Sequence, residues 1–236
     1  MVNALTSILL DHITGPFDVD ALFKTLRIRE NSHYAEKFKA MAAEAEKISK
    51  PKAFFCGAFI DTKGEDHVVI QGIKLSSRIL RVNLEEVYRI FPYVATCGLE
   101  LEDWSKSFDD LLEKFWADAI KEHALRLAFR YLNDYVLEKY GMKRLSRMNP
   151  GSLSDWPISE QGPLFAILGE GPRTIGIQLT DSFIMLPIKS ISGFFFPAEF
   201  SYENCLLCPR EKCPGRRAAY DSNLYEKKYG KKAKVS

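Results

Sequence analysis

A long helical pattern in the middle of the chain constrains the fold more than any other feature of the sequence. Between Asp109 and Tyr140, apolar residues recur at the spacing of an amphipathic helix. The expected apolar face consists of Leu112, Phe115, Ala119, Leu125, Phe129, Leu132 and Val136. Because such a helix needs an extended surface to pack against, we expect it to be the spine of the fold.

Shorter helix and strand patterns lie on both sides of this helix in the sequence. Residues 2–48 read as helical. One helix begins at 17–20, a second covers 34–48, and Pro51 ends the second helix. Further predicted elements are strands at 53–60 and 67–75, a helix at 78–88, a strand at 93–97 and a helix at 159–168. Helices and strands mix without regular alternation, which predicts an α+β fold with mixed helices around an antiparallel sheet.

An apolar run after the last of these helices predicts a β-hairpin. Residues 183–186 read as a buried strand, 187–190 as a turn and 191–196 as its partner strand. The second strand ends in three consecutive phenylalanines, Phe194 to Phe196. Because successive strand side chains point to opposite faces, we expect at least one of these rings to face solvent, a ligand or a partner.

The segment 147–151, which reads Arg-Met-Asn-Pro-Gly, is suited to binding a small anion. The guanidinium of Arg147 can hold a carboxylate through two parallel charge-assisted hydrogen bonds, and Gly151 lets the backbone approach a ligand closely. The alternative is that Pro150 and Gly151 form only a turn and that Arg147 pairs with a surface acid.

Together, these two segments resemble the activation domain of cobalamin-dependent methionine synthase. In that family an Arg-x-x-Pro-Gly loop binds S-adenosylmethionine, and a hairpin with the Leu-Thr-[Asp/Glu]-Ser-Phe and Ser-Gly-aromatic-aromatic-Phe motifs follows about thirty residues later. Here those motifs are residues 179–183 and 192–196, and the Thr-Cys-Gly at 96–98 is a third, weaker match. The resemblance covers roughly the second two thirds of the chain. It implies that the S-adenosylmethionine site includes Arg147, Asn149, Pro150, Gly151, Phe195 and Phe196.

The resemblance also implies a function. The resembled domain combines one electron with a methyl group from S-adenosylmethionine and so rescues a corrinoid that has been oxidised to cobalt(II). We expect a stand-alone protein that supports this reductive methylation, with cobalamin supplied by a partner: a corrinoid methyltransferase or a methionine synthase lacking this domain. A flavodoxin- or ferredoxin-type protein would donate the electron. Whether the chain is itself an enzyme is left open.

The chain differs from the family's sequence motifs at two positions. Ser152 stands where the family's loop carries a tyrosine, and Phe195 stands where tyrosine is usual. Asp61 and Glu122 are candidates to bind the ammonium group of the ligand.

Three cysteines near the end of the chain, Cys205, Cys208 and Cys213, form a C-x2-C-x4-C cluster. Three thiolates at this spacing can bind an iron–sulfur cluster or a zinc ion, and Cys97 or Cys56 is the candidate fourth ligand. We favour iron–sulfur because reactivating a corrinoid requires an electron, which zinc does not carry. The alternative is three free thiols.

Composition predicts a cytoplasmic globular protein. The 236 residues, 46% of them hydrophobic, can form one core with a short appendage. We expect an activation-like domain over 1–200, with a helical segment at 1–50, followed by a cysteine cluster and solvated basic tail over 201–236. The net charge of +2 gives no argument for nucleic acid. No apolar run reaches the roughly 18 residues that span a membrane.

Two other functions fit the sequence. One is an iron–sulfur redox adaptor whose ligand pocket is vestigial, which the departures at Ser152 and Phe195 favour. The other is a zinc-stabilised interaction module without redox activity. Binding of S-adenosylmethionine separates both from the first function, and the visible spectrum separates iron–sulfur from zinc.

Overall fold

The expected long helix is present in the computed structural model, which describes residues 6–197, 204–213, 216 and 218–229. This helix, α5 (Leu111–Lys139), begins after Asp110, whose carboxylate accepts hydrogen bonds from the backbone N–H groups of Leu112 and Glu113. Its buried stripe differs from the expected face, because Phe115 is 57% exposed while alanines are buried. The small side chains let the helix lie close to the sheet.

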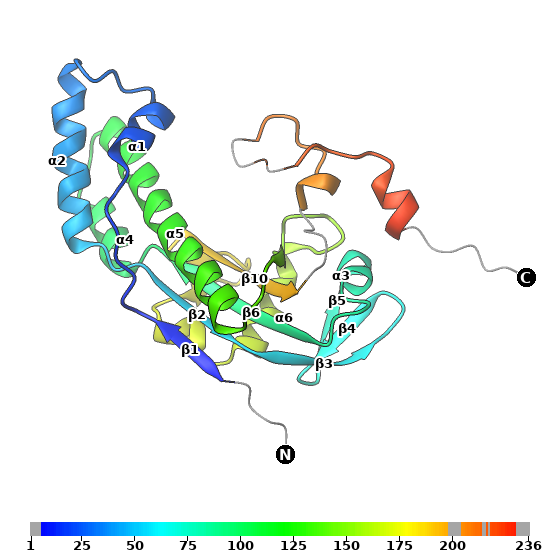
Figure 1. The fold of residues 1–236 in the computed structure, drawn as a ribbon. Helices are drawn as coiled ribbons and strands as arrows, with labels where there is room; N and C mark the ends of the chain where they lie inside the picture. The colour runs from blue at the N-terminus through cyan, green and yellow to red at the C-terminus, as the bar shows by residue number, and fades with distance from the viewer. Residues whose placement is uncertain (1–5, 198–203, 214–215, 217, 230–236) are drawn as a thin grey trace, which may run out of the picture.

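Eight strands form one antiparallel sheet in the order β1-β2-β6-β3-β4-β5, and β10 pairs with both β6 and β7 (Figure 1). The strands are β1 Ser7–Leu10, β2 Lys52–Cys56, β3 Ala58–Lys63, β4 His67–Ile70, β5 Ile73–Ser76, β6 Arg89–Thr96, β7 Leu145–Met148 and β10 Ser190–Pro197. A separate pair consists of β8 (Gln178–Leu179) and β9 (Met185–Leu186). The predicted α+β class and antiparallel sheet are therefore confirmed.

Helices cover both faces of this sheet and form two core clusters with it. The first cluster joins α5 to α1 (Val19–Leu26), α2 (His33–Ile48) and α4 (Leu99–Ser105). The second joins α3 (Arg78–Asn83), α6 (Gln161–Leu168) and the end of α7 (Gly171–Thr174). Strand residues alternate between them, so that Phe55 and Phe195 belong to the first cluster while Phe54 and Phe194 belong to the second.

Several predicted boundaries were wrong. Residues 7–10 form an edge strand on β2 rather than part of a helix, since the edge of the sheet offers them backbone partners. The expected strand at 67–75 is a hairpin, because Gln71 and Gly72 adopt positive φ between β4 and β5. The predicted strand at 53–60 is likewise two strands, β2 and β3. The predicted helix at 78–88 ends at Asn83.

The predicted hairpin at 183–196 was also wrong. β9 pairs with β8, whereas β10 pairs with β6 and β7. This places β10 inside the sheet with a core cluster on each face. Phe194, Phe195 and Phe196 are consequently all buried, at 0%, 0% and 2% exposure. The expectation that one of the rings is exposed fails because both faces of the strand are covered.

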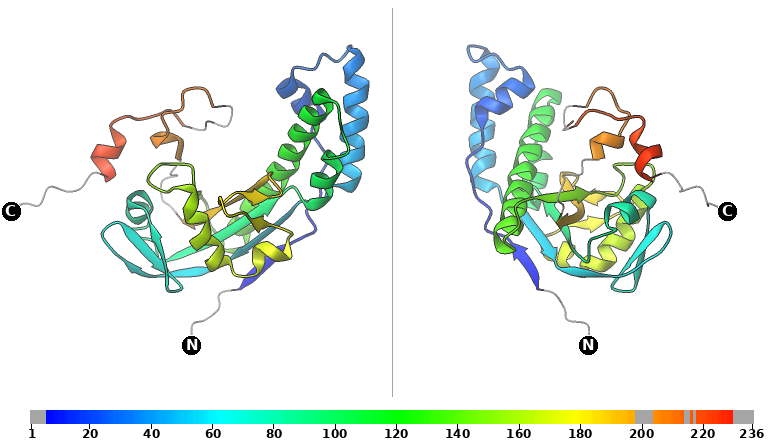
Figure 2. Two further views of the ribbon diagram at one scale, coloured as in Figure 1. Left: turned by 180° about the vertical axis from the view of Figure 1, so that it is seen from behind. Right: turned by 45° about the vertical axis from the view of Figure 1, so that its right-hand side comes forward.

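The described residues after 203, which we call the C-terminal segment, contain short helical turns at Asn204–Leu207 and Tyr225–Tyr229. The segment and the α1, α2 and α5 group rise from opposite ends of the molecule (Figure 2). Tyr229 is 1% exposed and donates a hydrogen bond of 2.8 Å from Oη to Asn83 Oδ1. The expectation of a solvated tail is therefore wrong for Tyr229, while residues 225–228 are exposed. The expected domain boundary at residue 200 and the lysines Lys231, Lys232 and Lys234 lie outside the described residues.

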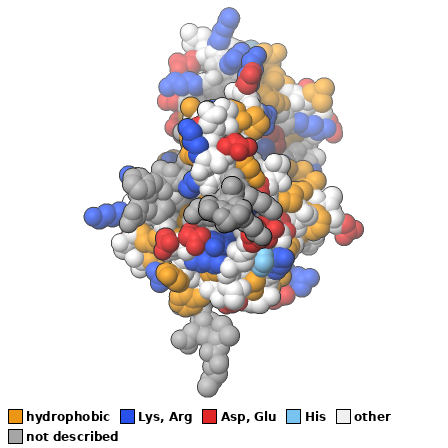
Figure 3. Space-filling model, turned by 90° about the vertical axis from the view of Figure 1, so that its right-hand side faces the viewer, with side chains coloured by type: hydrophobic (Ala, Val, Ile, Leu, Met, Phe, Trp, Pro, Cys, Tyr) orange, Lys and Arg blue, Asp and Glu red, His pale blue; other side chains and the backbone are white. Residues whose placement is uncertain are grey.

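The surface carries mixed charge. On the face in Figure 3, acidic and basic side chains are interspersed. Among the described helices, none combines the length and apolar character needed to cross a membrane.

Candidate functional site

Arg147 lies on β7, opposite Phe195 of β10. It is half-buried, and its guanidinium carbon lies 4.6 Å from the centre of the Phe129 ring on α5. Within the part of the chain that the structure describes, no carboxylate forms an ion pair with Arg147, which speaks against the alternative that it pairs with a surface acid. The ring contact does not use the N–H groups of the guanidinium as hydrogen-bond donors, so they can bind an anion.

Asn149 connects the end of β7 to the neighbouring strands. Its Nδ2 donates hydrogen bonds of 2.7 Å to Tyr93 Oη and to the backbone oxygen of Ser192. The Tyr93 ring in turn stacks on Phe195, with ring centres 4.2 Å apart. Burial raises the pKa of Tyr93 well above its usual range, so its hydroxyl stays protonated. This network fixes where the backbone leaves the strand.

The strands meet closely at Gly193. A Cβ built there would lie 2.3 Å from the backbone oxygen of Met148 and 2.6 Å from Asn149 Nδ2. Only glycine therefore fits the Ser-Gly-Phe motif in this position. Ser192 next to it donates a 2.6 Å hydrogen bond from Oγ to Oε1 of Gln161, the first residue of α6.

The loop after β7 is fixed by a turn and by the start of α3. Gly151 adopts φ +80° and donates its N–H to the backbone oxygen of Trp156 at 2.8 Å. Trp156 is buried against Phe194, with ring centres 5.4 Å apart. Asp155 Oδ2 accepts hydrogen bonds from Ser77 Oγ at 2.5 Å and from the Ile79 N–H at 2.9 Å. Pro150 is buried within this turn.

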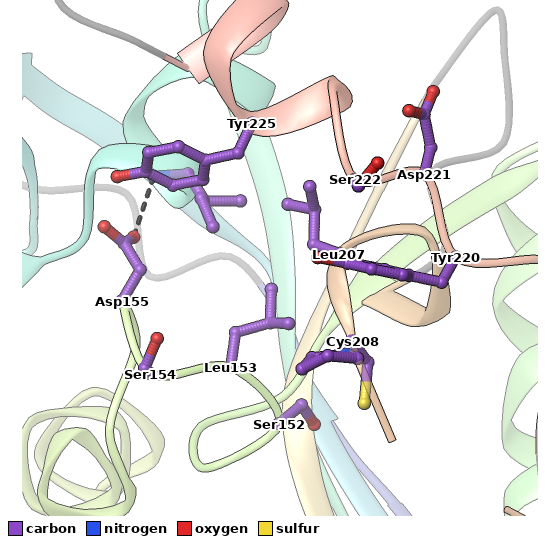
Figure 4. Close-up of a pocket in the computed structure, with 12 residues that line it drawn as sticks. Ser152, Leu153, Ser154, Asp155, Leu207, Cys208, Tyr220, Asp221, Ser222 and Tyr225 are labelled. Carbon is purple, nitrogen blue, oxygen red and sulfur yellow. Dashed lines mark hydrogen bonds between the residues drawn. The ribbon is translucent and has the colours of Figure 1, made fainter. Parts of the chain in front are cut away.

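A cavity of about 540 Å³ lies between this loop and the C-terminal segment (Figure 4). The loop contributes Ser152, Leu153, Ser154 and Asp155, α3 contributes Ile79, and the C-terminal segment contributes Leu207, Cys208, Pro209, Tyr220, Asp221, Ser222 and Tyr225. Its size falls in the range of small-molecule sites. The cavity thus begins directly after the Pro-Gly pair.

The two acidic candidates lie elsewhere. Asp61 Oδ2 accepts a 2.8 Å hydrogen bond from the Gly72 N–H at the β4–β5 turn. Glu122 on α5 accepts a 3.1 Å hydrogen bond from Arg126 and lies 3.7 Å from Lys189 Nζ. The structure gives both carboxylates protein partners and does not join either of them to Arg147.

The Thr-Cys-Gly at 96–98 ends a core strand. Thr96 Oγ1 accepts a 3.2 Å hydrogen bond from the Gly98 N–H, and Gly98 precedes α4. A Cβ at Gly98 would lie 2.5 Å from the backbone oxygen of Lys50, so the glycine allows two chain segments to approach each other.

The cysteines fall into two groups. Cys56 and Cys97 are buried, and burial raises the pKa of their thiols to about 11 and about 12. Cys205, Cys208 and Cys213 are half-exposed. Among the residues with described placement, no three His, Cys, Asp or Glu side chains are arranged to hold a metal ion. Cys97 is buried whereas the other three are half-exposed, so we expect it not to join them as a ligand; metal binding by the C-terminal cysteines stays a prediction.

Arg216 holds the cysteine loop together. Its guanidinium donates hydrogen bonds to the backbone oxygens of Cys205 at 3.1 Å, Cys208 at 3.0 Å and Ala218 at 3.1 Å. The Arg216 side chain therefore helps to fix the shape of the cysteine loop.

The sequence did not reveal all of these residues. Tyr93 and Gln161 support the Arg-x-x-Pro-Gly loop from distant positions, and Tyr220 and Tyr225 reach its cavity from the C-terminal segment. The sequence signal for Tyr220 and Tyr225 was the presence of two tyrosines shortly after the cysteine cluster.

Comparison with solved structures finds a similar fold in the crystal structure of the MetH reactivation domain bound to AdoHcy. The superposition has a TM-score of 0.60 at 16% sequence identity and covers 86% of this chain and 82% of that chain. The chain has the fold of the MetH reactivation domain. The predicted resemblance to a methionine synthase activation domain is thus confirmed at the level of the fold. No protein-family profile matches the sequence, and no curated protein does either.

Proposed function

We propose that this protein binds S-adenosylmethionine and supports the reductive methylation of a corrinoid held by a partner protein. The observation that carries the proposal is the half-buried guanidinium of Arg147, which lies against Phe129 without a carboxylate among the described residues. A cation with no acidic partner among the described residues suits the carboxylate of an amino-acid ligand. The neighbour in the same fold was solved with AdoHcy, the product that S-adenosylmethionine leaves after methyl transfer.

The residues around Arg147 would orient this ligand. Asn149 fixes the exit of the strand, and Pro150 and Gly151 bring the loop backbone to the ligand. Phe195 and Phe196 support Arg147 and the loop from within the core, as their rings are buried. Because the protein supplies positioning rather than an acid or a base, its contribution is the geometry that presents the methyl group.

The partner supplies cobalamin, and a flavodoxin- or ferredoxin-type protein supplies one electron that reduces cobalt(II) to cobalt(I). The reduced corrinoid would supply the nucleophile for the methyl group, while Arg147 and the loop through Gly151 would hold S-adenosylmethionine in place. The partner is a corrinoid methyltransferase, such as a methionine synthase that lacks this domain.

Calorimetry of S-adenosylmethionine binding tests the proposal. Arg147→Ala should weaken binding by about 2 kcal/mol or more, the scale of losing a charge-assisted pair, and Arg147→Lys should recover only part of it. Arg144→Ala is the matched control, because Arg144 is exposed and lies three residues earlier. Wild-type protein that binds no S-adenosylmethionine, or an Arg147→Ala variant with unchanged affinity, would show that the proposal is wrong.

A further inference from the structure

The cavity between the Arg147 loop and the C-terminal segment is not explained by the core or by the resembled motifs. Its most distinctive lining is a pair of aromatic rings that the core leaves uncovered: Tyr220 is 48% exposed and Tyr225 is 41% exposed. In Figure 4 the Tyr225 ring points toward Asp155, and the Tyr220 ring extends beside Leu207. Exposed rings at the wall of a concave site suit a flat aromatic ligand.

We infer that this cavity binds the nucleoside half of S-adenosylmethionine and that Tyr220 of the C-terminal segment provides the stacking surface for its base. The inference rests on the proposed function and adds a subsite to it. The loop contributes Ser152, Leu153, Ser154 and Asp155 to the lining, and none of these side chains carries a ring. The aromatic surface of the cavity therefore comes from the C-terminal segment, in which Tyr220 lies 68 positions after Ser152.

Polar groups around the rings match the remaining part of a nucleoside. Ser152, Ser154 and Ser222 place hydroxyl groups in the lining, and Asp221 adds a carboxylate. Asp221 Oδ1 already accepts a 3.0 Å hydrogen bond from the Asn223 N–H. A carboxylate has capacity for further donors, and the hydroxyl groups of a ribose are such donors.

Both walls of the cavity are anchored, so that the site is formed before a ligand arrives. On one side, Asp155 is held by Ser77 and by the Ile79 N–H. On the other side, the Asp221 N–H donates a 2.9 Å hydrogen bond to the backbone oxygen of Leu206. The Tyr229 backbone oxygen accepts a 3.2 Å hydrogen bond from Arg78 Nε, which fixes the segment beyond Tyr225. Preorganisation of this kind lowers the entropic cost of binding.

Arg147 and the cavity are joined by one short stretch of chain. The Ser152 N–H donates a 3.3 Å hydrogen bond to the backbone oxygen of Asn149, so a tight turn separates the cavity entrance from the strand that carries Arg147. The inference assigns the carboxylate of the ligand to Arg147 and its base to the cavity that follows this turn.

Two probes separate the subsite from the carboxylate site: S-adenosylmethionine, which has both halves, and 5′-methylthioadenosine, which lacks the carboxylate. In the full-length protein, Tyr220→Ala should weaken the binding of both probes about tenfold, within the range for removing an aromatic partner from a stacked base. Tyr220→Phe should restore binding. The exposed Tyr88, which is 71% accessible, gives the control variant Tyr88→Ala, with no expected change.

Arg147→Ala distinguishes the two assignments, because it should weaken S-adenosylmethionine and leave 5′-methylthioadenosine unaffected. If wild-type protein binds S-adenosylmethionine and Tyr220→Ala binds it equally well, the subsite is wrong while the proposed function stands. If wild-type protein binds only 5′-methylthioadenosine and Tyr220→Ala loses it, the subsite is supported and the proposed function fails. Wild-type protein that binds neither probe overturns both. Circular dichroism of each variant verifies that its fold is intact.

Discussion

Asn149 Nδ2 lies 2.7 Å from Tyr93 Oη, and this hydrogen bond joins the end of β7 to the middle of β6. The two strands do not pair with each other, since β10 lies between them. The bond therefore spans a whole strand and sets the position of the loop that follows Arg147.

Replacing Asn149 with Ala should reduce the free energy of unfolding by about 1–3 kcal/mol, because the buried Tyr93 hydroxyl loses its partner. Tyr93→Phe in the same protein removes the orphaned hydroxyl, so the double variant should be more stable than the sum of the two single changes predicts. Urea denaturation of all four proteins measures this coupling. Strictly additive effects would mean that the bond contributes nothing to the folded state.

Gly193→Ala should destabilise the protein by about 3 kcal/mol or more, because a methyl group in a close backbone contact forces strands apart. The new Cβ would meet the Met148 backbone oxygen at 2.3 Å. Gly15→Ala serves as the control, since its Cβ would lie at an ordinary 3.6 Å from Leu127 Cδ2. Thermal unfolding compares the two, and similar melting temperatures would contradict the close approach of β10 and β7.

Docking of the C-terminal segment should depend on pH through Tyr229. Burial raises the pKa of this tyrosine to about 12, against about 10 in the unfolded chain. Its contribution to stability is complete below about pH 10 and disappears as the pH rises toward 12, because the unfolded chain releases the proton first. Urea denaturation of wild-type and Tyr229→Phe proteins between pH 8 and 12 should give curves that converge. A constant difference over that range would refute the assignment.

The cysteine cluster predicts that protein purified without oxygen carries iron and sulfide. Cys208→Ser should remove both together with the visible colour. Cys97→Ala should retain them, because Cys97 is fully buried in the core and the other three cysteines are half-exposed. Metal analysis and visible spectra decide the matter. Metal-free wild-type protein, or loss of iron in the Cys97→Ala variant alone, would contradict the prediction.

The sequence predicted those parts of the molecule in which the local pattern and the final packing agree. The helix expected at 109–140 is α5, at 111–139, because its periodicity and its Asp110 cap act within a few turns. The strand at 93–97 was found as the second half of β6, since a continuous apolar run marks a strand buried on both faces.

Pairings between distant segments could not be predicted in this way. The apolar run at 191–196 has the same sequence pattern whether it pairs with the preceding strand or with β6. In the structure it pairs with β6. The wider site shares this difficulty. Arg147 and its loop were visible as a motif, but Tyr93 lies 56 positions from Asn149, and Tyr220 comes from a segment that reads as a tail.

The placement of β10 has a consequence for how the protein is made. Ser190 pairs with Thr96, 94 positions earlier, so one side of β6 has no strand beside it until β10 has been synthesised. A nascent chain that ends before residue 190 presents an apolar strand edge, which is a template for association with other chains. Truncated forms of this protein should therefore need a chaperone, or should aggregate, even though most of their helices can already form.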